Sequence, residues 1–349
     1  MDVLNMTSRK RETYQIKLEH SLLWECALGI AAVTNARLLD TLEQPDDYWN
    51  GIKQSLSDKM LEHLNYVEKN NTWKALLQLL HQRNFKDLAE FNTYIENLNS
   101  EEMKHNCLPY VGSRYKNSRE QASSGDKSAI NDLKNITKEN PFFPAYIEYI
   151  CTVDIEILKK HLCFVMEGWY KAAIEPEANK IQAILERDFN SKNHMQKKMS
   201  SEELVEWATG GSTYYPEPGV YHVLLIPQYV YRPWNIEADI EGIKVFYYPV
   251  ANESVHPGSD FQPNQFLVNK YKALGDEVRL KIVKYLSEGD STLQELTNKL
   301  EMGKSTVHHH LKILRSAKLV EIIESKYRLK KNTLDALAKE LEQFVYGKQ

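Results

Sequence analysis

The sequence predicts a mostly α-helical protein with small β elements, and three observations support this fold class. Apolar residues recur at helical spacing through most of the first 200 residues, as in Trp73, Leu76, Leu77 and Leu80. β-Branched and aromatic residues gather in two short runs near 220–250, which predict a small sheet or a long hairpin. Near the C-terminus, two short helical patterns around a glycine-containing turn precede two further β-prone runs.

The length and composition predict two or three domains. The chain has 349 residues and 42% hydrophobic content, which is enough to bury substantial cores. We expect a helical N-terminal subdomain over 1–117 and a helical and partly β sensing or scaffold region over 118–260. A third domain is expected over 261–349. Segments rich in Ser, Gly or Pro at 117–126 and 252–264 mark the two boundaries.

Targeting signals and metal-binding patterns are not found in the sequence. Met1–Met6 lacks the apolar run of a secretory signal, and the apolar stretch Leu22–Val33 contains Glu25 and is too short to span a bilayer. Four cysteines without metal-ligand spacing suit a reducing compartment: Cys26, Cys107, Cys151 and Cys163. We therefore expect a cytoplasmic protein with no membrane partner, no metal and no cofactor.

The first 268 residues read as helices followed by strands. Leu22, Leu23 and Cys26 lead one predicted helix. Four residues further on are spaced to share one buried helix face: Tyr146, Ile150, Val153 and Ile157. The two runs predicted as strands are 221–226 and 243–248.

Aromatic residues around these predicted strands form a candidate ligand pocket with one arginine. The candidate residues are Tyr231, Arg232, Trp234 and Tyr247. Ligand sites are mostly apolar with a few polar anchors, which fits this set. Packing in a core explains aromatic residues more often, and the sequence favours this second interpretation.

The C-terminal pattern predicts a helix-turn-helix. The first helix lies within Ser291–Leu300, Glu301–Gly303 is the turn, and the second helix lies within Gly303–Arg315. At 100° per residue, the second helix has one apolar face, formed by Val307, Leu311 and Leu314. Two short helices joined by a tight turn that contains Gly are typical of DNA-binding proteins, in which the second helix enters the major groove.

The opposite face of the second helix carries hydrogen-bond donors. Ser305 or Thr306 can cap its N-terminus, where free N–H groups also suit a DNA phosphate. His308 and His309 suit base edges or phosphates, with plain solvent exposure as the alternative. His310 lies beside the packing face, so a partly buried histidine is at least as good an interpretation as a phosphate contact.

A basic wing and an amphipathic terminal helix follow. The runs 319–323 and 327–329 predict a hairpin around Glu324-Ser325-Lys326, with basic residues that suit phosphate contacts. The predicted DNA-binding residues are Lys304, Ser305, Thr306, His308, His309, Lys312, Arg315, Lys326, Arg328 and Lys330. The terminal helix has an apolar stripe suited to pairing with a second subunit, formed by Leu334, Leu337, Leu341, Phe344 and Val345.

Charge separates the C-terminal module from the rest of the chain. Residues 269–349 hold 16 Lys and Arg against 11 Asp and Glu, a net charge of +5. The remaining 28 basic and 37 acidic residues give residues 1–268 a net charge of −9. The acidic whole chain therefore contains a basic module, as expected for a DNA-binding domain.

Residues from about 269 to 346 resemble an ArsR-type winged-helix transcription factor. The resemblance rests on Ala273-Leu274-Gly275-Asp276 and Arg279–Ile282 in the first helix, on Ser305–Val320, and on Tyr327-Arg328-Leu329. Three departures are Glu277 in place of a frequent proline, His308-His309 in place of a Ser-Arg pair, and Lys318 in place of a helix-ending glycine. We expect Lys318 to adopt a positive φ. The Cys and His ligands of the family's metal sensors are absent from the corresponding helices.

The resemblance implies a homodimeric, sequence-specific DNA-binding transcriptional regulator, by default a repressor. More loosely, the whole chain resembles long bacterial ArsR-type regulators, which implies that the large N-terminal part senses an effector or serves as a scaffold. The partners implied are double-stranded DNA, a second copy of the chain and a small-molecule or protein effector that the sequence does not identify.

Two alternatives stay open. The winged helix can serve as a protein-interaction or dimerisation module without specific DNA binding, since fold alone does not establish function. The N-terminal region can also be an enzyme regulated by the C-terminal dimer. The sequence contains no G-x-S-x-G, H-E-x-x-H or D-x-D-x-D-G motif, so we expect no enzymatic activity.

Overall fold

The computed structural model describes residues 14–346 except 198, 259–262, 264 and 324, and they form two compact units. Unit 1 comprises residues up to Ser201 together with Tyr215–Val250, and unit 2 comprises Glu202–Tyr214 and the chain from Ala251 onward. The expected boundary at 117 is not observed, because helices on its two sides pack together. Met1–Met6, Glu324 and part of the expected linker 252–264 lie outside the described residues.

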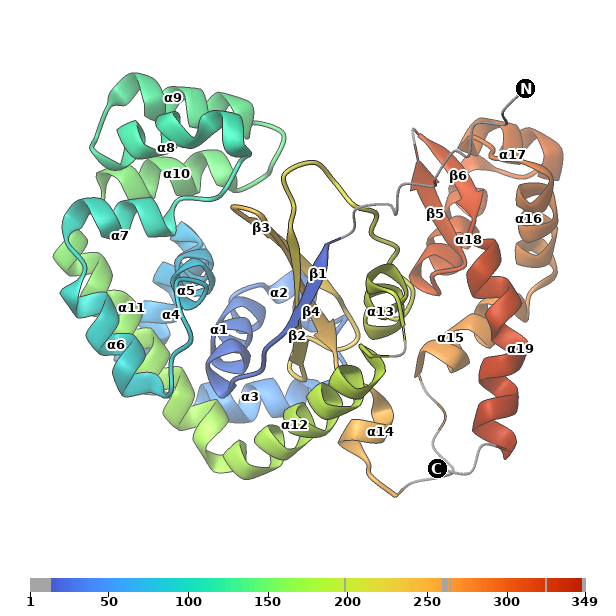
Figure 1. Cartoon of the computed structure of the whole chain (residues 1–349), viewed down its shortest axis with the longest axis horizontal. Helices are drawn as coiled ribbons and strands as arrows, with labels where there is room; N and C mark the ends of the chain where they lie inside the picture. Colours follow the sequence, from blue (N-terminus) through green and yellow to red (C-terminus); the bar gives the residue numbers. More distant parts are fainter. Residues whose placement is uncertain (1–13, 198, 259–262, 264, 324, 347–349) are drawn as a thin grey trace, which may run out of the picture. The chain divides into compact units, whose positions relative to one another are not determined.

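Unit 1 consists of helices around a four-stranded sheet (Figure 1). Its strands are β1 (Gln15–Leu18), β2 (His222–Gln228), β3 (Ile236–Ile240) and β4 (Ile243–Pro249). Its α-helices are α1 (Leu22–Val33), α2 (Ala36–Leu39), α3 (Asp46–Ser55), α4 (Asp58–Asn70), α5 (Trp73–Leu80), α6 (Leu88–Asn97), α7 (Ser100–Cys107), α8 (Lys116–Ser123), α9 (Lys127–Ile136), α10 (Phe143–Thr152), α11 (Ile155–Trp169) and α12 (Ala178–Met195). Short 3₁₀ or π turns occupy Ser113–Tyr115, Tyr170–Ile174 and Glu175–Glu177.

The sheet has the strand order β1-β2-β4-β3 and is mainly parallel. β1 and β4 both run parallel to β2, whereas β3 is an antiparallel edge strand on β4. The two runs predicted as strands are therefore neighbours in a sheet and do not form a hairpin. β1 was not predicted, because four residues with a single buried side chain, Ile16, give too little alternation to indicate a strand.

Helix α1 forms the centre of unit 1 and is buried on all sides from Leu23 to Val33. Its one charged residue, Glu25, accepts hydrogen bonds from the backbone N–H groups of Tyr229 (2.6 Å) and Val230 (3.0 Å). Burial raises the pKa of Glu25 to about 7. A carboxyl group at this depth needs such donors, so Glu25 fixes the segment that follows β2 against α1.

The predicted helix face through Val153 and Ile157 is interrupted. Asp154 is the N-cap of α11, where its carboxylate accepts hydrogen bonds from the N–H groups of Glu156 and Ile157. The cap starts a new helix after Thr152, so Ile157 turns outward and is 59% exposed.

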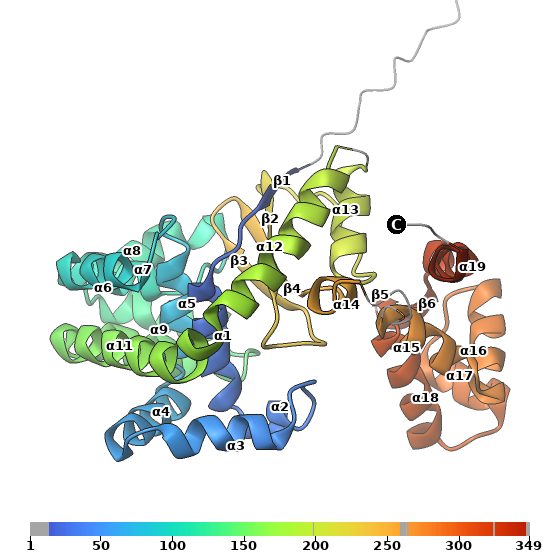
Figure 2. The ribbon, with the colours of Figure 1, turned by 90° about the horizontal axis from the view of Figure 1, so that it is seen from below.

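Helix α12 lies along the sheet beside β1 and β2 (Figures 1 and 2). It carries a buried ion pair in which the Lys192 ammonium lies 3.3 Å from the Asp188 carboxylate. The same ammonium is 5.7 Å from the centre of the Tyr248 ring on β4. Charges that are buried without a partner are costly, so this pair depends on α12 remaining on the sheet.

Unit 2 contains the C-terminal module and one segment from the middle of the chain. Its helices are α13 (Ser201–Ala208), α14 (Asn252–Val255), α15 (Gln265–Leu274), α16 (Glu277–Glu288), α17 (Leu293–Leu300), α18 (Lys304–Ser316) and α19 (Lys331–Tyr346). Strands β5 (Val320–Ile323) and β6 (Lys326–Leu329) form an antiparallel hairpin. Within the described part of the chain, every helix is too short or too polar to cross a membrane.

Candidate nucleic-acid interface

Helices α17 and α18 form a helix-turn-helix. Thr292 caps α17 in a reciprocal capping box with Glu295. The turn is made by Glu301, which adopts a left-handed conformation with φ 53°, and by Gly303, the N-cap of α18 with φ −63°. The predicted cap on α18 by Ser305 or Thr306 is wrong, because both residues lie inside the first turn and the Gly303 N-cap has no side chain to accept a hydrogen bond.

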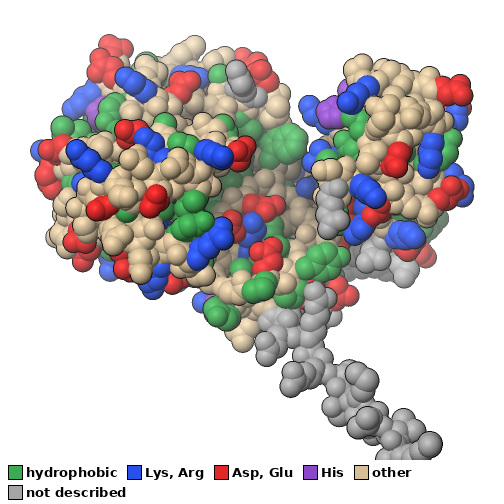
Figure 3. Space-filling view, turned by 90° about the horizontal axis from the view of Figure 1, so that it is seen from above, with side chains coloured by type: hydrophobic (Ala, Val, Ile, Leu, Met, Phe, Trp, Pro, Cys, Tyr) green, Lys and Arg blue, Asp and Glu red, His purple; other side chains and the backbone are tan. Residues whose placement is uncertain are grey.

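Helix α18 divides into a buried face and an exposed face, as its sequence predicts. Val307, Leu311 and Leu314 are each 0% exposed and belong to the core of unit 2. The exposed face carries the predicted contact residues of this helix: Lys304, Ser305, Thr306, His308, His309, Lys312 and Arg315. Figure 3 shows histidine side chains beside Lys and Arg side chains on one edge of unit 2. The helix therefore presents a basic, donor-rich surface on a rigidly packed base.

His310 differs from its two neighbours. Its side chain is 14% exposed, and its Nδ1 atom lies 3.6 Å from the carboxylate of Asp276. Asp276 is the N-cap of α16, and the N–H group of Arg279 together with nearby positive charge lowers the pKa of that carboxyl. His310 thus faces the start of α16, which fits the interpretation of a partly buried histidine.

The exposed side of the wing carries two basic residues, and one of them forms an ion pair with a residue outside the wing. Lys326 is exposed in β6. Arg328 is also exposed, but its guanidinium donates to both carboxylate oxygens of Asp290, with the shortest distance 2.6 Å. Tyr327 between them is buried and exchanges two backbone hydrogen bonds with Ser291. This pairing holds the wing against the segment that precedes α17.

The prediction that Lys330 contacts DNA is wrong. Its side chain is 7% exposed, and its ammonium donates to the backbone carbonyl of Gly211 and lies 3.4 Å from the Glu206 carboxylate. Both partners belong to the segment 202–214, which is part of unit 2 although it lies more than a hundred residues before the wing in the chain. Because its donors are directed into the unit, Lys330 cannot reach a DNA phosphate.

A second lysine anchors the same segment. Lys318 adopts φ 58°, as predicted from its replacement of a glycine, and its ammonium donates to Ser212 Oγ at 3.1 Å. Gly211 has φ 107°, and a Cβ atom there would lie 2.9 Å from Cβ of Lys318. Only glycine fits this close approach, so residues 206–212 pack directly on the turn between α18 and β5.

Part of the predicted dimerisation stripe of helix α19 packs against the core of its own unit. Leu337 is 6% exposed and Leu334 packs against the core of unit 2, so neither can serve mainly as a contact with a partner. Phe344 is half-buried. Leu341 and Val345 are 38% and 53% exposed, respectively, and they remain as candidates for contact with a second subunit.

The candidate pocket residues are engaged in packing and pairing. Arg232 is buried and its Nε lies 2.9 Å from the Glu43 carboxylate, while the Tyr247 hydroxyl is 2.6 Å from His81 Nε2. The Trp234 indole N–H donates to Thr41 Oγ1 at 3.0 Å, and burial raises the pKa of Tyr231. Arg232 and Trp234 thereby tie the loop after β2 to residues 41–43, and none of the four side chains lines the cavity of unit 1 described below. The pocket interpretation is therefore replaced by the packing one.

The described residues were compared with two further kinds of site, a metal centre and a reactive thiol. Within these residues, no group of three or more His, Cys, Asp or Glu side chains is arranged to hold a metal ion. All four cysteines are free, and burial raises the pKa of each thiol, which makes it less reactive.

The α16–α17–α18 helices with the β5–β6 hairpin define unit 2 as a winged helix-turn-helix. Residues 276–321 match the model of the bacterial regulatory protein, arsR family. The chain is also 35% identical over 52 residues to the transcriptional repressor SdpR of Bacillus subtilis (strain 168). That match covers 15% of this chain and 58% of the relative. The comparison with solved structures gave no match. The C-terminal module is thus an ArsR-type helix-turn-helix.

Proposed function

We propose that this protein is a cytoplasmic, sequence-specific transcriptional regulator that binds double-stranded DNA as a homodimer and is not an enzyme. The observation that carries the proposal is the exposed face of α18, where Lys304, His308, Lys312 and Arg315 are held opposite an entirely buried face. Side chains of this kind donate to phosphates and to guanine or adenine edges in the major groove. The basic net charge of residues 269–349 supports the same proposal.

The proposed mode of action is repression, with unit 1 as the effector domain. In a dimer joined through α19, two copies of α18 would meet half-sites about one DNA turn apart, roughly 34 Å. An effector on unit 1 changes DNA affinity only if it favours one arrangement of the two helices over another. The likeness to the transcriptional repressor SdpR supports repression as the proposed mode of action.

Fluorescence anisotropy tests the proposal with the full chain, a duplex from its own upstream region, and a scrambled duplex. Binding should be selective for the first duplex and should weaken steeply between about 50 and 200 mM salt. Lys312→Glu combined with His308→Ala should abolish selective binding. Lys180→Glu, the same charge reversal on an exposed lysine of α12, is the matched control.

Two results would count against DNA regulation. Equal binding of both duplexes by the wild type and the double variant would mean that α18 reads no sequence in this DNA. No binding at low salt, with an intact dimer, would favour a winged helix that serves protein interaction.

A further inference from the structure

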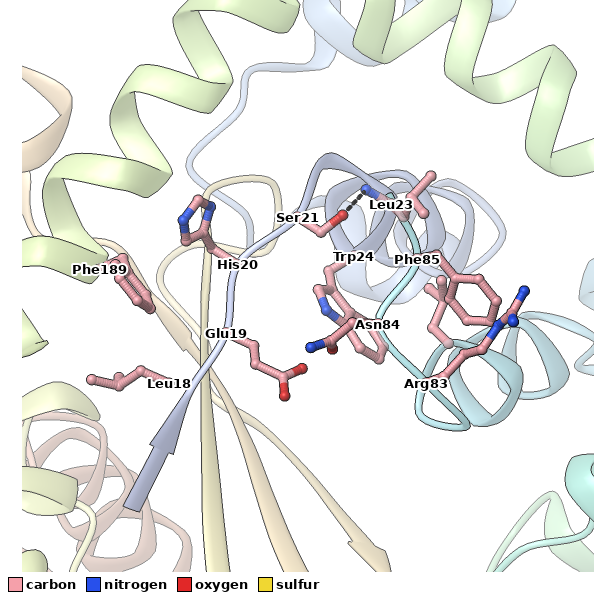
Figure 4. Close-up of a pocket in the computed structure, with 11 residues that line it drawn as sticks. Leu18, Glu19, His20, Ser21, Leu23, Trp24, Arg83, Asn84, Phe85 and Phe189 are labelled. Atoms are coloured by element: carbon pink, nitrogen blue, oxygen red, sulfur yellow. Dashed lines mark hydrogen bonds between the residues drawn. The ribbon is translucent and has the colours of Figure 1, made fainter. Parts of the chain in front are cut away.

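A cavity opens in unit 1 at the carboxyl end of β1, where the chain turns into α1 (Figure 4). Its volume is about 310 Å³. Its walls come from the end of β1, the first turn of α1, residues 83–85 after α5, and Phe189 of α12. Sites for small organic ligands start at about 300 Å³, and ligands of open α/β sheets bind beyond the carboxyl ends of strands. The size and position of the cavity thus suit a small molecule.

Glu19 provides the charge of this cavity. Figure 4 shows its carboxyl group directed toward Asn84 and the ring of Trp24. The side chain is half-buried, and this burial raises the pKa of Glu19 more than the nearby charge of Lys17 lowers it. Among the described residues, no basic group lies within ion-pair distance of this carboxylate. A ligand cation would supply the missing charge.

The second charged residue at the cavity already has partners. The Arg83 guanidinium lies 3.4 Å from the Glu90 carboxylate. It also lies 5.0 Å from the ring centre of Phe85 and 5.0 Å from that of Tyr94. Its charge is therefore balanced by Glu90 and lies against two aromatic faces, whereas the carboxylate of Glu19 has no ion-pair partner among the described residues.

Apolar and aromatic side chains complete the wall beside Glu19. Trp24 is 5% exposed and presents its ring to the cavity, with Leu80 and Phe85 nearby. Aromatic rings attract cations as well as apolar groups. On the other side of the strand end, His20 packs edge-to-face on Phe189 with ring centres 4.7 Å apart, and burial lowers the pKa of His20. The lowered pKa disfavours a competing positive charge on His20.

We propose that this cavity binds a small organic amine, with its ammonium group on Glu19 and its apolar body against Trp24 and Phe85. A carboxylate ligand would meet the like charge of Glu19, and a neutral ligand would leave that charge unpaired. The site deepens the proposed function, because it names the ligand class of unit 1. Only its effect on DNA binding rests on that function.

Isothermal titration calorimetry on the full chain, without DNA, tests the ligand class with three probes that share a benzene ring. We expect saturable binding of phenethylamine and none of 3-phenylpropionate or 2-phenylethanol. Glu19→Gln should weaken phenethylamine by about tenfold or more, the usual effect of losing a charged hydrogen bond. Glu62→Gln, on the exposed surface of α4, should leave the affinity unchanged.

A second variant and a pH series keep the test independent of how well Glu19→Gln folds. Asn84→Asp adds a carboxylate on an exposed residue of the same wall and should tighten phenethylamine binding. With the wild type, affinity should fall as the pH drops through the raised pKa of Glu19, because the protonated carboxyl no longer attracts a cation.

Three results would overturn the proposal: no saturable binding of phenethylamine by the wild type, equal binding of 3-phenylpropionate, or unchanged affinity in folded Glu19→Gln. Because no DNA is present, these results are independent of the anisotropy experiment. If the protein binds the amine but no DNA, the proposed amine site holds and the proposed regulatory function is refuted. If it binds DNA but no amine, only the proposed amine site is refuted.

Discussion

Replacing Lys330 with methionine should loosen residues 206–212 from the winged helix without removing a contact to DNA. The side chain is 7% exposed, and its ammonium is held by the carbonyl of Gly211 and the carboxylate of Glu206. Methionine keeps most of the volume but donates no hydrogen bond. The variant therefore isolates the polar contribution of this buried lysine.

The expected loss follows from the two partners. A buried carbonyl that loses its donor costs about 1–3 kcal/mol. The Glu206 side chain is 27% exposed, so water compensates most of the broken ion pair and its contribution is at most about 1 kcal/mol. The free energy for local opening should thus fall by about 1–4 kcal/mol, which corresponds to a roughly 5- to 900-fold increase in the open population.

Hydrogen exchange followed by mass spectrometry measures this opening directly in the peptides that span 206–212 and 326–333. Lys331→Met, an exposed neighbour at the start of α19, is the matched control and should exchange like the wild type. Equal exchange in the two variants would refute the reasoning. A lower DNA affinity of Lys330→Met with unchanged exchange would also refute it, because the ammonium would then have to contact phosphate.

Two further predictions concern assembly and pH. Leu341→Glu combined with Val345→Glu places charges on exposed positions of α19, so it should yield a folded monomer by light scattering; a persistent dimer would place the interface elsewhere. The pKa of Glu25 in the folded protein, about 7, lies above its ordinary value, so the folded protein binds the proton more tightly than the unfolded chain. The contribution of Glu25 to the free energy of unfolding therefore falls as the pH rises from about 4.5 to about 7. The decrease in the free energy of unfolding that is attributable to Glu25 is about 3 kcal/mol. Urea unfolding at pH 5 and 7.5 should show this decrease for the wild type but not for Glu25→Gln. An identical pH dependence in the variant would contradict this assignment.

The helix-turn-helix was predictable because its information is local. Val307, Leu311 and Leu314 recur at helical spacing, and this spacing alone places His308 and Lys312 on the opposite face. The amphipathic pattern and the basic charge of residues 269–349 therefore predicted a DNA-binding helix-turn-helix, and the resemblance of segments such as Ser305–Val320 to the ArsR-type pattern indicated the family. Exposure of the predicted contact residues on α18 agrees with that analysis.

The cavity at the end of β1 could not be found in the same way. Its carboxylate, Glu19, precedes α1 by a few residues, but Asn84 and Phe189 come from distant segments. Strand β1 itself is recognised only through its pairing with β2, about two hundred residues later. The aromatic cluster Tyr231–Trp234 was more conspicuous in the sequence, yet the polar groups of Arg232 and Trp234 are occupied by partners in the fold.

The sequence by itself determined which side chains of α18 turn inward and the net charge of the C-terminal module, and its resemblance to the ArsR-type pattern predicted the positive φ at Lys318. Only the tertiary structure decided that Lys330 is buried against Gly211 and Glu206 while Lys326, on the same short wing, stays exposed. The physical reason is that periodicity encodes whether a residue faces a core, whereas the partner that a buried polar group meets there depends on segments that are far apart in the chain.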